Sequence, residues 1–201
     1  DYLRGLREGL GERAGTMMAA EASFEVTDPT VDSQIISLHA SGADTFFIFS
    51  SPKAAAQAIR KVWDLGWRPL QFVGSPASSV ATVLKPAGLE KSVGIIGGAF
   101  LKDPTDSHWQ NDAGLHSWLE FMTTYDPEGD VTDFYNVYAY ATAQTLVQVL
   151  RQCGDELTRE NLMRQAANLK NLELPILIPG IRINTGPDDY SPIEQMQLQR
   201  F

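Results

Sequence analysis

The chain has 201 residues, of which 43% are hydrophobic and 20% charged, so it can bury a sizeable core as one large domain or two small ones. Its net charge of −9 gives no electrostatic basis for binding DNA or RNA, whose phosphates require clustered Lys and Arg. No apolar run approaches the roughly 20 residues that span a bilayer. The single cysteine, Cys153, excludes an intrachain disulfide and a thiolate metal cluster.

The first hundred residues predict helices alternating with buried strands. The spacing of Leu3, Leu6 and Leu10 predicts an opening helix over 1–14. Because the chain starts inside this pattern, with no initiator Met or leader, we expect it to be a piece of a longer protein. A strand over 16–22 and a loop over 24–29 follow. We then expect helices over 30–40 and 52–65, a short helix that ends at about residue 84, a turn over 86–88, and strands over 45–51, 70–74 and 93–100.

After Phe100 the pattern changes to a mostly helical one. Residues 101–106 contain a proline and three charges, which is typical of a crossover between lobes. The remaining patterns predict helices over 112–125, 132–153 and 158–169, and strands over 181–184 and 193–201. Helices must bury their apolar faces against other elements, and this part of the chain predicts too few strands to form a sheet of its own for them to pack on.

This alternation predicts an α/β fold with a parallel sheet covered by helices on both faces. Ligands bind outside the carboxyl ends of such strands. Ser50, Ser51, Ser75 and Ser78 lie at or just past two predicted strand ends, and none of them belongs to a GxSxG motif. Two interpretations stay open: the hydroxyls form turns and helix caps, or they bind a polar ligand together with free helix N–H groups.

Other chemistry-bearing residues favour structural roles. Asp103, Asp106, Asp188 and Asp189 flank or occupy turns, where Asp side chains bond to nearby N–H groups. The histidines form no metal-binding motif, and we expect neither a metal nor a cofactor. The glycines at 94, 97 and 98 do not form GxGxxG before a helix, so a close backbone approach or a bulge explains them better than a dinucleotide site.

An aromatic run marks the start of the longest predicted helix. Tyr135 and Tyr138 share a helix face in this run, which also contains Phe134 and Tyr140. Core packing is one interpretation. The other is a ring presented to an apolar or aromatic ligand at the edge of a cleft, which Phe100 and Trp109 would help to line.

Four stretches carry a family resemblance: residues 24–29 (FEVTDP), 42–53 (GADTFFIFSSPK), 65–69 (LGWRP) and 150–180. Their order and spacing resemble periplasmic substrate-binding proteins of ABC importers, of the branched-chain amino-acid receptor type. The resemblance covers nearly the whole chain. It implies the type I periplasmic-binding-protein fold, with two α/β lobes and ligand held between them. Residues 1–103 and 191–201 would form the second lobe, and 104–190 the returning part of a first lobe that is incomplete here.

The resemblance also implies ligand-binding positions. In the family, the turns that correspond to Ser50-Ser51 and to Ser75-Pro76-Ala77-Ser78 contact ligand, and Tyr135 matches an aromatic residue that faces it. Phe100 and Lys102 would lie at the crossing between the lobes. Amino-acid receptors carry an acid in the second turn, where it pairs with the ligand's ammonium. This chain has none there, which disfavours an α-amino-acid ligand and favours an aromatic or other apolar carboxylate.

The resemblance therefore implies a non-enzymatic, periplasmic solute-binding protein that delivers its ligand to ABC permease subunits. A ligand-sensing domain of the same fold, and an α/β enzyme whose catalytic part lies elsewhere, stay open as alternatives. We also expect either self-association or a contact with a missing N-terminal segment, because apolar surface left exposed drives pairing with another chain.

Overall fold

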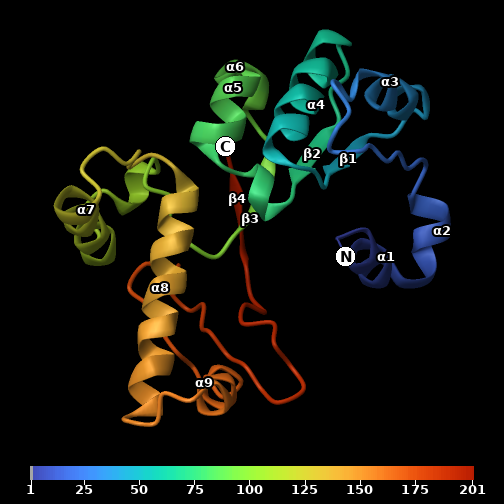
Figure 1. Cartoon of the computed structure of the whole chain (residues 1–201). Helices are drawn as coiled ribbons and strands as arrows, with labels where there is room; N and C mark the ends of the chain where they lie inside the picture. Colours follow the sequence, from blue (N-terminus) through green and yellow to red (C-terminus); the bar gives the residue numbers. More distant parts are fainter. Residues whose placement is uncertain (1) are drawn as a thin grey trace. The chain divides into compact units, whose positions relative to one another are not determined.

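The computed structural model describes residues 2–201 and divides into two compact units. Unit 1 contains the described residues up to Gly98 together with Leu198–Phe201, and unit 2 contains Ala99–Gln197. Figure 1 shows their helices and strands in chain order. Each unit has an apolar core of its own, so each is described by itself.

A four-stranded sheet organises unit 1. Its order is β1 (Thr45–Ile48), β2 (Leu70–Val73), β3 (Ile96–Ala99) and β4 (Gln197–Arg200). β1 pairs with β2, and β2 with β3, in parallel. The three strands predicted from buried apolar runs are confirmed, each somewhat shorter than its run. The α/β fold class with a mainly parallel sheet is likewise confirmed.

Helices pack on the buried face of this sheet. They are α3 (Asp32–Ala40), α4 (Pro52–Asp64), α5 (Lys85–Ala87) and α6 (Leu89–Ser92), with a 3₁₀ turn η2 (Ser75–Ala77) and a π-helical segment η3 (Val80–Leu84). The core joins Phe46 and Ile48 of β1 to Ile59 and Val62 of α4. Proline suits the first position of α4. It lacks a backbone N–H, and an N–H at that position would have no partner within the helix.

Two predictions for the start and middle of unit 1 are wrong. Residues 2–17 form α1 (Tyr2–Leu10), η1 (Gly11–Arg13) and α2 (Ala14–Met17), so the predicted strand over 16–22 begins inside a helix, and its remaining residues have no regular structure. Its Met and Ala residues have weak strand preference, and none of the described strands pairs with it. The turn expected over 86–88 is helical as far as Ala87. Only Gly88 turns the chain, with φ +109°.

Unit 2 is mostly helical. It contains η4 (Ser107–Trp109), α7 (Ala113–Tyr125), α8 (Phe134–Cys153) and α9 (Arg159–Ala166). Side chains of Asp112, Asp133 and Thr158 cap the three α-helices, accepting hydrogen bonds from N–H groups of the first turn. Within residues 2–201, no helix has the length and apolarity needed to cross a membrane.

Residues 181–201 form less strand than the sequence predicts. Of residues 181–184 and 193–201, only Gln197–Arg200 is a strand. Ile183 makes isolated antiparallel bridges to Leu172 and Ile193. Pro187 and Pro192 lie between or beside these positions and cannot donate to a ladder, which limits pairing to single bridges.

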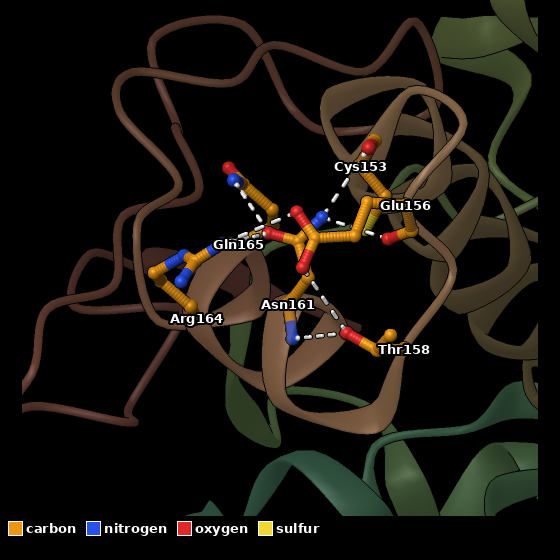
Figure 2. A network of polar contacts seen from close by, with 6 residues as sticks. All are labelled: Cys153, Glu156, Thr158, Asn161, Arg164 and Gln165. Atoms are coloured by element: carbon orange, nitrogen blue, oxygen red, sulfur yellow. Dashed lines mark hydrogen bonds and ion pairs between the residues drawn. The ribbon is translucent and has the colours of Figure 1, made fainter.

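A buried amide joins α8 to α9. Figure 2 shows the network around Asn161, which is 3% exposed. Its Nδ2 donates to the carbonyl oxygens of Cys153 (3.2 Å) and Glu156 (2.8 Å). Its Oδ1 accepts from Arg164 (2.7 Å) and Gln165 (3.2 Å). One side chain therefore satisfies carbonyl groups at the end of α8 and fixes the first turn of α9.

Candidate ligand-binding site

The predicted serines lie at one edge of the unit 1 sheet. β1 and β2 run parallel with Ile48 opposite Val73, and the Gly74 N–H donates to the Ile48 carbonyl at 3.1 Å. The turn that contains Ser50 and Ser51 therefore lies beside the turn that begins at Ser75. The structure thus brings together Ser50, Ser51, Ser75, Pro76 and Ser78 at the carboxyl ends of two adjacent strands.

Three of the hydroxyls in these turns are used locally. Ser50 Oγ donates to the Ser51 carbonyl at 3.3 Å, and Ser78 Oγ donates to the Ser75 carbonyl at 2.8 Å. Ser79 Oγ accepts from the Thr82 N–H at 3.2 Å and caps η3. These bonds are contacts of turn formation and capping, and the ligand contacts expected of Ser50 and Ser78 stay a prediction.

Ser51 and Ser75 differ from the other serines. Ser51 is the N-cap residue of α4, with extended backbone (φ −66°, ψ 158°), yet its side chain makes no capping hydrogen bond. Ser75 opens η2. Over residues 2–201, neither hydroxyl has a hydrogen-bond partner, and both side chains are half-buried. Among the described residues of these two turns, they are the two hydroxyls that make no internal hydrogen bond.

An aromatic pair borders the second turn. The rings of Tyr2 and Phe49 are stacked, with centroids 5.1 Å apart and an interplanar angle of 14°. A Cβ atom at Gly74 would lie 3.5 Å from Tyr2 Cζ and 3.7 Å from Phe49 Cδ1, so both rings contact the backbone just before Ser75. Sequence reasoning missed both. Phe49 could have been found from its place beside Ser50, whereas no sequence signal joins Tyr2 to this edge.

Gly97 on β3 permits the turn after β2 to pack closely. A Cβ atom there would lie 3.1 Å from Ser78 Cβ and 3.4 Å from Val73 Cγ2. The close backbone approach expected for the glycines of this strand is confirmed at Gly97. Gly94 is different, because it has a positive φ of +91° and open space around it.

In unit 2, Lys102 has its charge fully engaged. Its Nζ donates to Asp112 Oδ2 and to the Pro175 carbonyl, both at 2.7 Å, and lies 5.3 Å from the centre of the Trp109 ring. The side chain is 6% exposed. Sequence reasoning placed Lys102 at the crossing but missed these partners.

Asp112 has two structural functions in this cluster. Its Oδ2 receives Lys102, and its Oδ1 accepts from the Leu115 N–H at 2.9 Å to cap α7. Partial burial disfavours the charged carboxylate. The hydrogen bonds from Lys102 and from the backbone outweigh this effect and hold the pKa of Asp112 below its ordinary value.

Phe100 and Tyr135 lie elsewhere in unit 2. The half-buried Phe100 ring meets Tyr138 edge-on, with centroids 6.2 Å apart. Tyr135, on the first turn of α8, is 38% exposed, and its ring centroid lies 6.4 Å from that of Phe134. Phe134 itself is 8% exposed, so the aromatic run divides between core and surface.

The described residues show no metal-binding arrangement. Across residues 2–201, no three His, Cys, Asp or Glu side chains gather closely enough to hold a metal ion. What the sheet edge offers is hydroxyls, backbone N–H groups and aromatic rings. These groups can bind a small molecule that combines polar oxygens with an apolar body.

Comparison with known proteins defines the class. The family model described as "Periplasmic binding protein" matches residues 1–201. The chain belongs to this family, which confirms the family resemblance found in the sequence. No curated protein matched the chain.

Solved structures show the same fold at low sequence identity. A substrate-binding periplasmic protein from Ralstonia solanacearum is 18% identical, covers 90% of this chain and 50% of its own, and has a TM-score of 0.77. A branched-chain amino acid ABC transporter from Thermus thermophilus with bound valine is 11% identical. The match covers 90% of this chain and 48% of the transporter chain, with a TM-score of 0.73.

An extracellular ligand-binding receptor from Rhodopseudomonas palustris HaA2 is 18% identical. The match covers 100% of this chain and 57% of the receptor chain, with a TM-score of 0.72. The fold is thus that of type I periplasmic binding proteins. The chain spans about half the length of these solved structures.

Proposed function

We propose that this chain contributes the second lobe and part of the first lobe of an extracytoplasmic solute-binding protein. The protein captures a small organic ligand outside the cytoplasm and delivers it to the permease of an ABC importer, without chemical change. Membership of the periplasmic binding protein family supports this proposal. In this proposal the second lobe comprises residues 1–103 with 191–201, and the part of the first lobe comprises residues 104–190.

The pair of unengaged hydroxyls at the sheet edge is the observation that carries the proposal. Ser51 stands at the start of α4, where N–H groups of the first turn have no partner within the helix. Ser75 follows the adjacent parallel strand. A carboxylate or other polar oxygen placed there would receive hydrogen bonds from a hydroxyl and from the N-terminal end of a helix, both of which favour negative charge.

The composition of the second turn favours a ligand without an ammonium group. Residues 74–79 contain no acid, and a buried ammonium without a counter-charge is costly. Stacked rings of Tyr2 and Phe49 lie beside the same turn. Benzoate-like aromatic acids, or other apolar carboxylates, match this combination better than leucine or valine does. In the proposal, Phe100 and Tyr135 of unit 2 provide further aromatic contacts to the ligand.

Lys102 enters the proposal as a positioning residue. Its ammonium already has a carboxylate, a carbonyl and an aromatic ring as partners. Two of its three N–H groups donate to these oxygens, and the side chain is only 6% exposed. We infer that Lys102 fixes the segment after β3 to the start of α7, and that the ligand is bound by its neighbours.

A thermal-shift screen tests the proposed function. The purified chain would be heated with benzoate, 4-hydroxybenzoate, leucine and valine in turn, and each solution analysed by mass spectrometry afterwards. We expect a rise in Tm with the aromatic acids, a smaller one or none with the amino acids, and unchanged compounds. Stabilisation by leucine or valine alone would contradict the ligand class, and consumption of a compound would contradict the non-enzymatic role.

Tyr135→Ala tests the contribution of α8 to the same ligand. Tyr125→Ala is the matched control, because Tyr125 is 74% exposed on α7 and has no part in the proposal. We expect Tyr135→Ala to weaken binding of the best aromatic acid about fivefold, since an aromatic contact contributes about 1 kcal/mol. Equal affinities for the two variants would remove Tyr135 from the site.

A further inference from the structure

The helical segment that follows the second serine turn has an uncommon hydrogen-bond register. In η3, the Leu84 N–H donates to the Ser79 carbonyl at 3.1 Å, and the Lys85 N–H donates to the Val80 carbonyl. Both bonds join residues five positions apart, whereas the bonds of an α-helix join residues four positions apart. Such π-type turns are rare and occur frequently at functional sites. This one begins directly after residues 75–79, whose first hydroxyl is a proposed ligand contact.

Pro86 explains the register. η3 continues directly into α5, so Pro86 lies inside a helical run that extends from Val80 to Ala87. In an α-helix, residue 86 would donate its N–H to the carbonyl of Thr82. Proline has no N–H, and its ring would collide with that carbonyl. A wider turn before the proline moves the carbonyl aside, so the π register accommodates Pro86 within the run.

The π register has an unfavourable consequence at Thr82. The Thr82 Oγ1 atom is buried, and no hydrogen-bond partner for it lies among residues 2–201. A threonine within an α-helix can bond to the carbonyl four residues earlier, which here is that of Ser78. A buried hydroxyl without a partner destabilises a fold. Departures of this kind from local rules are expected where a segment serves a function.

The register of η3 reaches the turn that begins at Ser75 through Ser79. Ser79 Oγ accepts from the Thr82 N–H at 3.2 Å, and the Ser79 carbonyl accepts from the Leu84 N–H. The preceding residue, Ser78, donates through its Oγ to the Ser75 carbonyl at 2.8 Å. A change of register in η3 would therefore be transmitted along this short stretch of chain to Ser75.

We propose that Pro86 is a positioning residue of the ligand site, because it imposes the π register on residues 80–84 and this register sets the position of the Ser75 hydroxyl. The inference rests on the proposed function, in which that hydroxyl binds the ligand. In an α register, the chain before Thr82 would shift relative to α5 by about 1.5 Å and about 100°, the rise and rotation of one residue. A hydroxyl displaced this far loses its bond to a ligand oxygen, because such bonds require about 2.5–3.0 Å between the two oxygens.

Pro86→Ala separates positioning from a purely structural role. Pro86 is exposed, so its replacement removes little buried surface. The alanine N–H can donate to the Thr82 carbonyl, and in the α register the Thr82 hydroxyl can bond to the Ser78 carbonyl. These gains oppose the greater freedom of the unfolded chain without the proline. We therefore expect an unliganded Tm equal to or above that of the wild type, together with weaker ligand binding.

Backbone NMR and isothermal titration of the whole chain test the proposal. In Pro86→Ala, we expect the amide signals of residues 75–79 to shift and the Kd for benzoate to rise about fivefold, the effect of one lost hydrogen bond. Lys85→Ala is the matched control, because Lys85 is the exposed neighbour of Pro86 in α5 and its replacement keeps the proline. This control should match the wild type in amide signals and in affinity.

The two measurements distinguish failure of this inference from failure of the proposed function. Unmoved signals for residues 75–79 in Pro86→Ala would overturn the inference, whether or not benzoate binds. Shifted signals with unchanged affinity would also overturn it, and so would a Tm that falls together with the affinity. A wild type that binds no aromatic acid would contradict the proposed ligand class, and the amide signals would still decide whether Pro86 sets the turn.

Discussion

The serine turns of unit 1 and the Lys102 cluster of unit 2 were both predicted from the sequence as ligand contacts. They differ in how many of their polar groups make hydrogen bonds within the folded protein. Lys102 is 6% exposed on its side chain and donates to two oxygens at 2.7 Å, so it completes a closed network. Ser51 and Ser75 are half-buried, with hydroxyls that serve no internal contact. A polar residue near a predicted site is therefore suited to ligand binding only when it keeps donors or acceptors that the folded protein does not use.

The largest effect is expected when the closed network is opened at Lys102. Lys102→Met keeps most of the side-chain volume but leaves Asp112 partly buried without its counter-charge and the Pro175 carbonyl without its donor. Removing one partner of a buried ion pair typically costs about 3–5 kcal/mol, and we expect a loss of that order in the free energy of unfolding, measured by urea titration. Lys91→Met is the control, because the Asp64 side chain of that pair is 60% exposed and the pair should contribute under about 1 kcal/mol. Equal losses for the two variants would contradict the distinction.

A second closed network, around Asn161, should respond similarly but less strongly. Asn161→Ala removes the donor to the Cys153 and Glu156 carbonyls and leaves both without that partner. We expect unfolding to become easier by about 1–3 kcal/mol. Ligand affinity should not change, since Asn161 is not among the proposed ligand contacts. Gln165→Ala, which removes only one contact to the same amide oxygen, is the milder control.

Gly97 connects packing to the open hydroxyls. Gly97→Val would force side-chain atoms against Ser78 and Val73, which already lie 3.1 and 3.4 Å from an ideal Cβ position. Overpacking of this kind costs about 1–3 kcal/mol, and it should displace the turn that begins at Ser75. We therefore expect lower stability and weaker ligand binding together. Gly9→Val meets no atom within 4 Å and should leave ligand binding unchanged. Full affinity in Gly97→Val would show that the turn position does not matter.

The smallest expected effect is the pH dependence of the Lys102 cluster. The pKa of Asp112 is lowered in the folded protein, so its carboxylate stabilises the fold above the unfolded-state pKa of about 4, and this contribution is lost as the pH falls through the folded-state value. The free energy of unfolding should decline less steeply in Asp112→Asn than in the wild type between neutral pH and about pH 3. Parallel declines for the two proteins would contradict this assignment.

The sequence predicted the buried parts of the fold better than its free edges. Strands such as Thr45–Ile48 and the helix from Pro52 follow from local apolar pattern and turn residues, and both were predicted. The strand expected over 16–22 failed because a strand needs a neighbour, and none of the described strands pairs with this segment. Pairing depends on distant parts of the chain and leaves no local signal.

The candidate site divides in the same way. The position of Ser51 and Ser75 at one sheet edge follows from the alternation of strands and helices. Which hydroxyls remain available does not, because it depends on individual bonds such as that from Ser78 to the Ser75 carbonyl. The contact between Lys102 and Pro175 joins residues 73 positions apart, and the stacking of Tyr2 on Phe49 joins two segments that no motif connects.

Isothermal titration of the double variant Ser51→Ala/Ser75→Ala tests the account most directly. The titrant is the aromatic acid that stabilises the wild type best, and the control is Ser37→Ala, whose hydroxyl donates only within α3. The account predicts an affinity lower by about tenfold or more, from two hydrogen bonds of about 1 kcal/mol each, with an unliganded Tm close to that of the wild type. Unchanged affinity in the double variant would contradict the claim that these two hydroxyls bind the ligand.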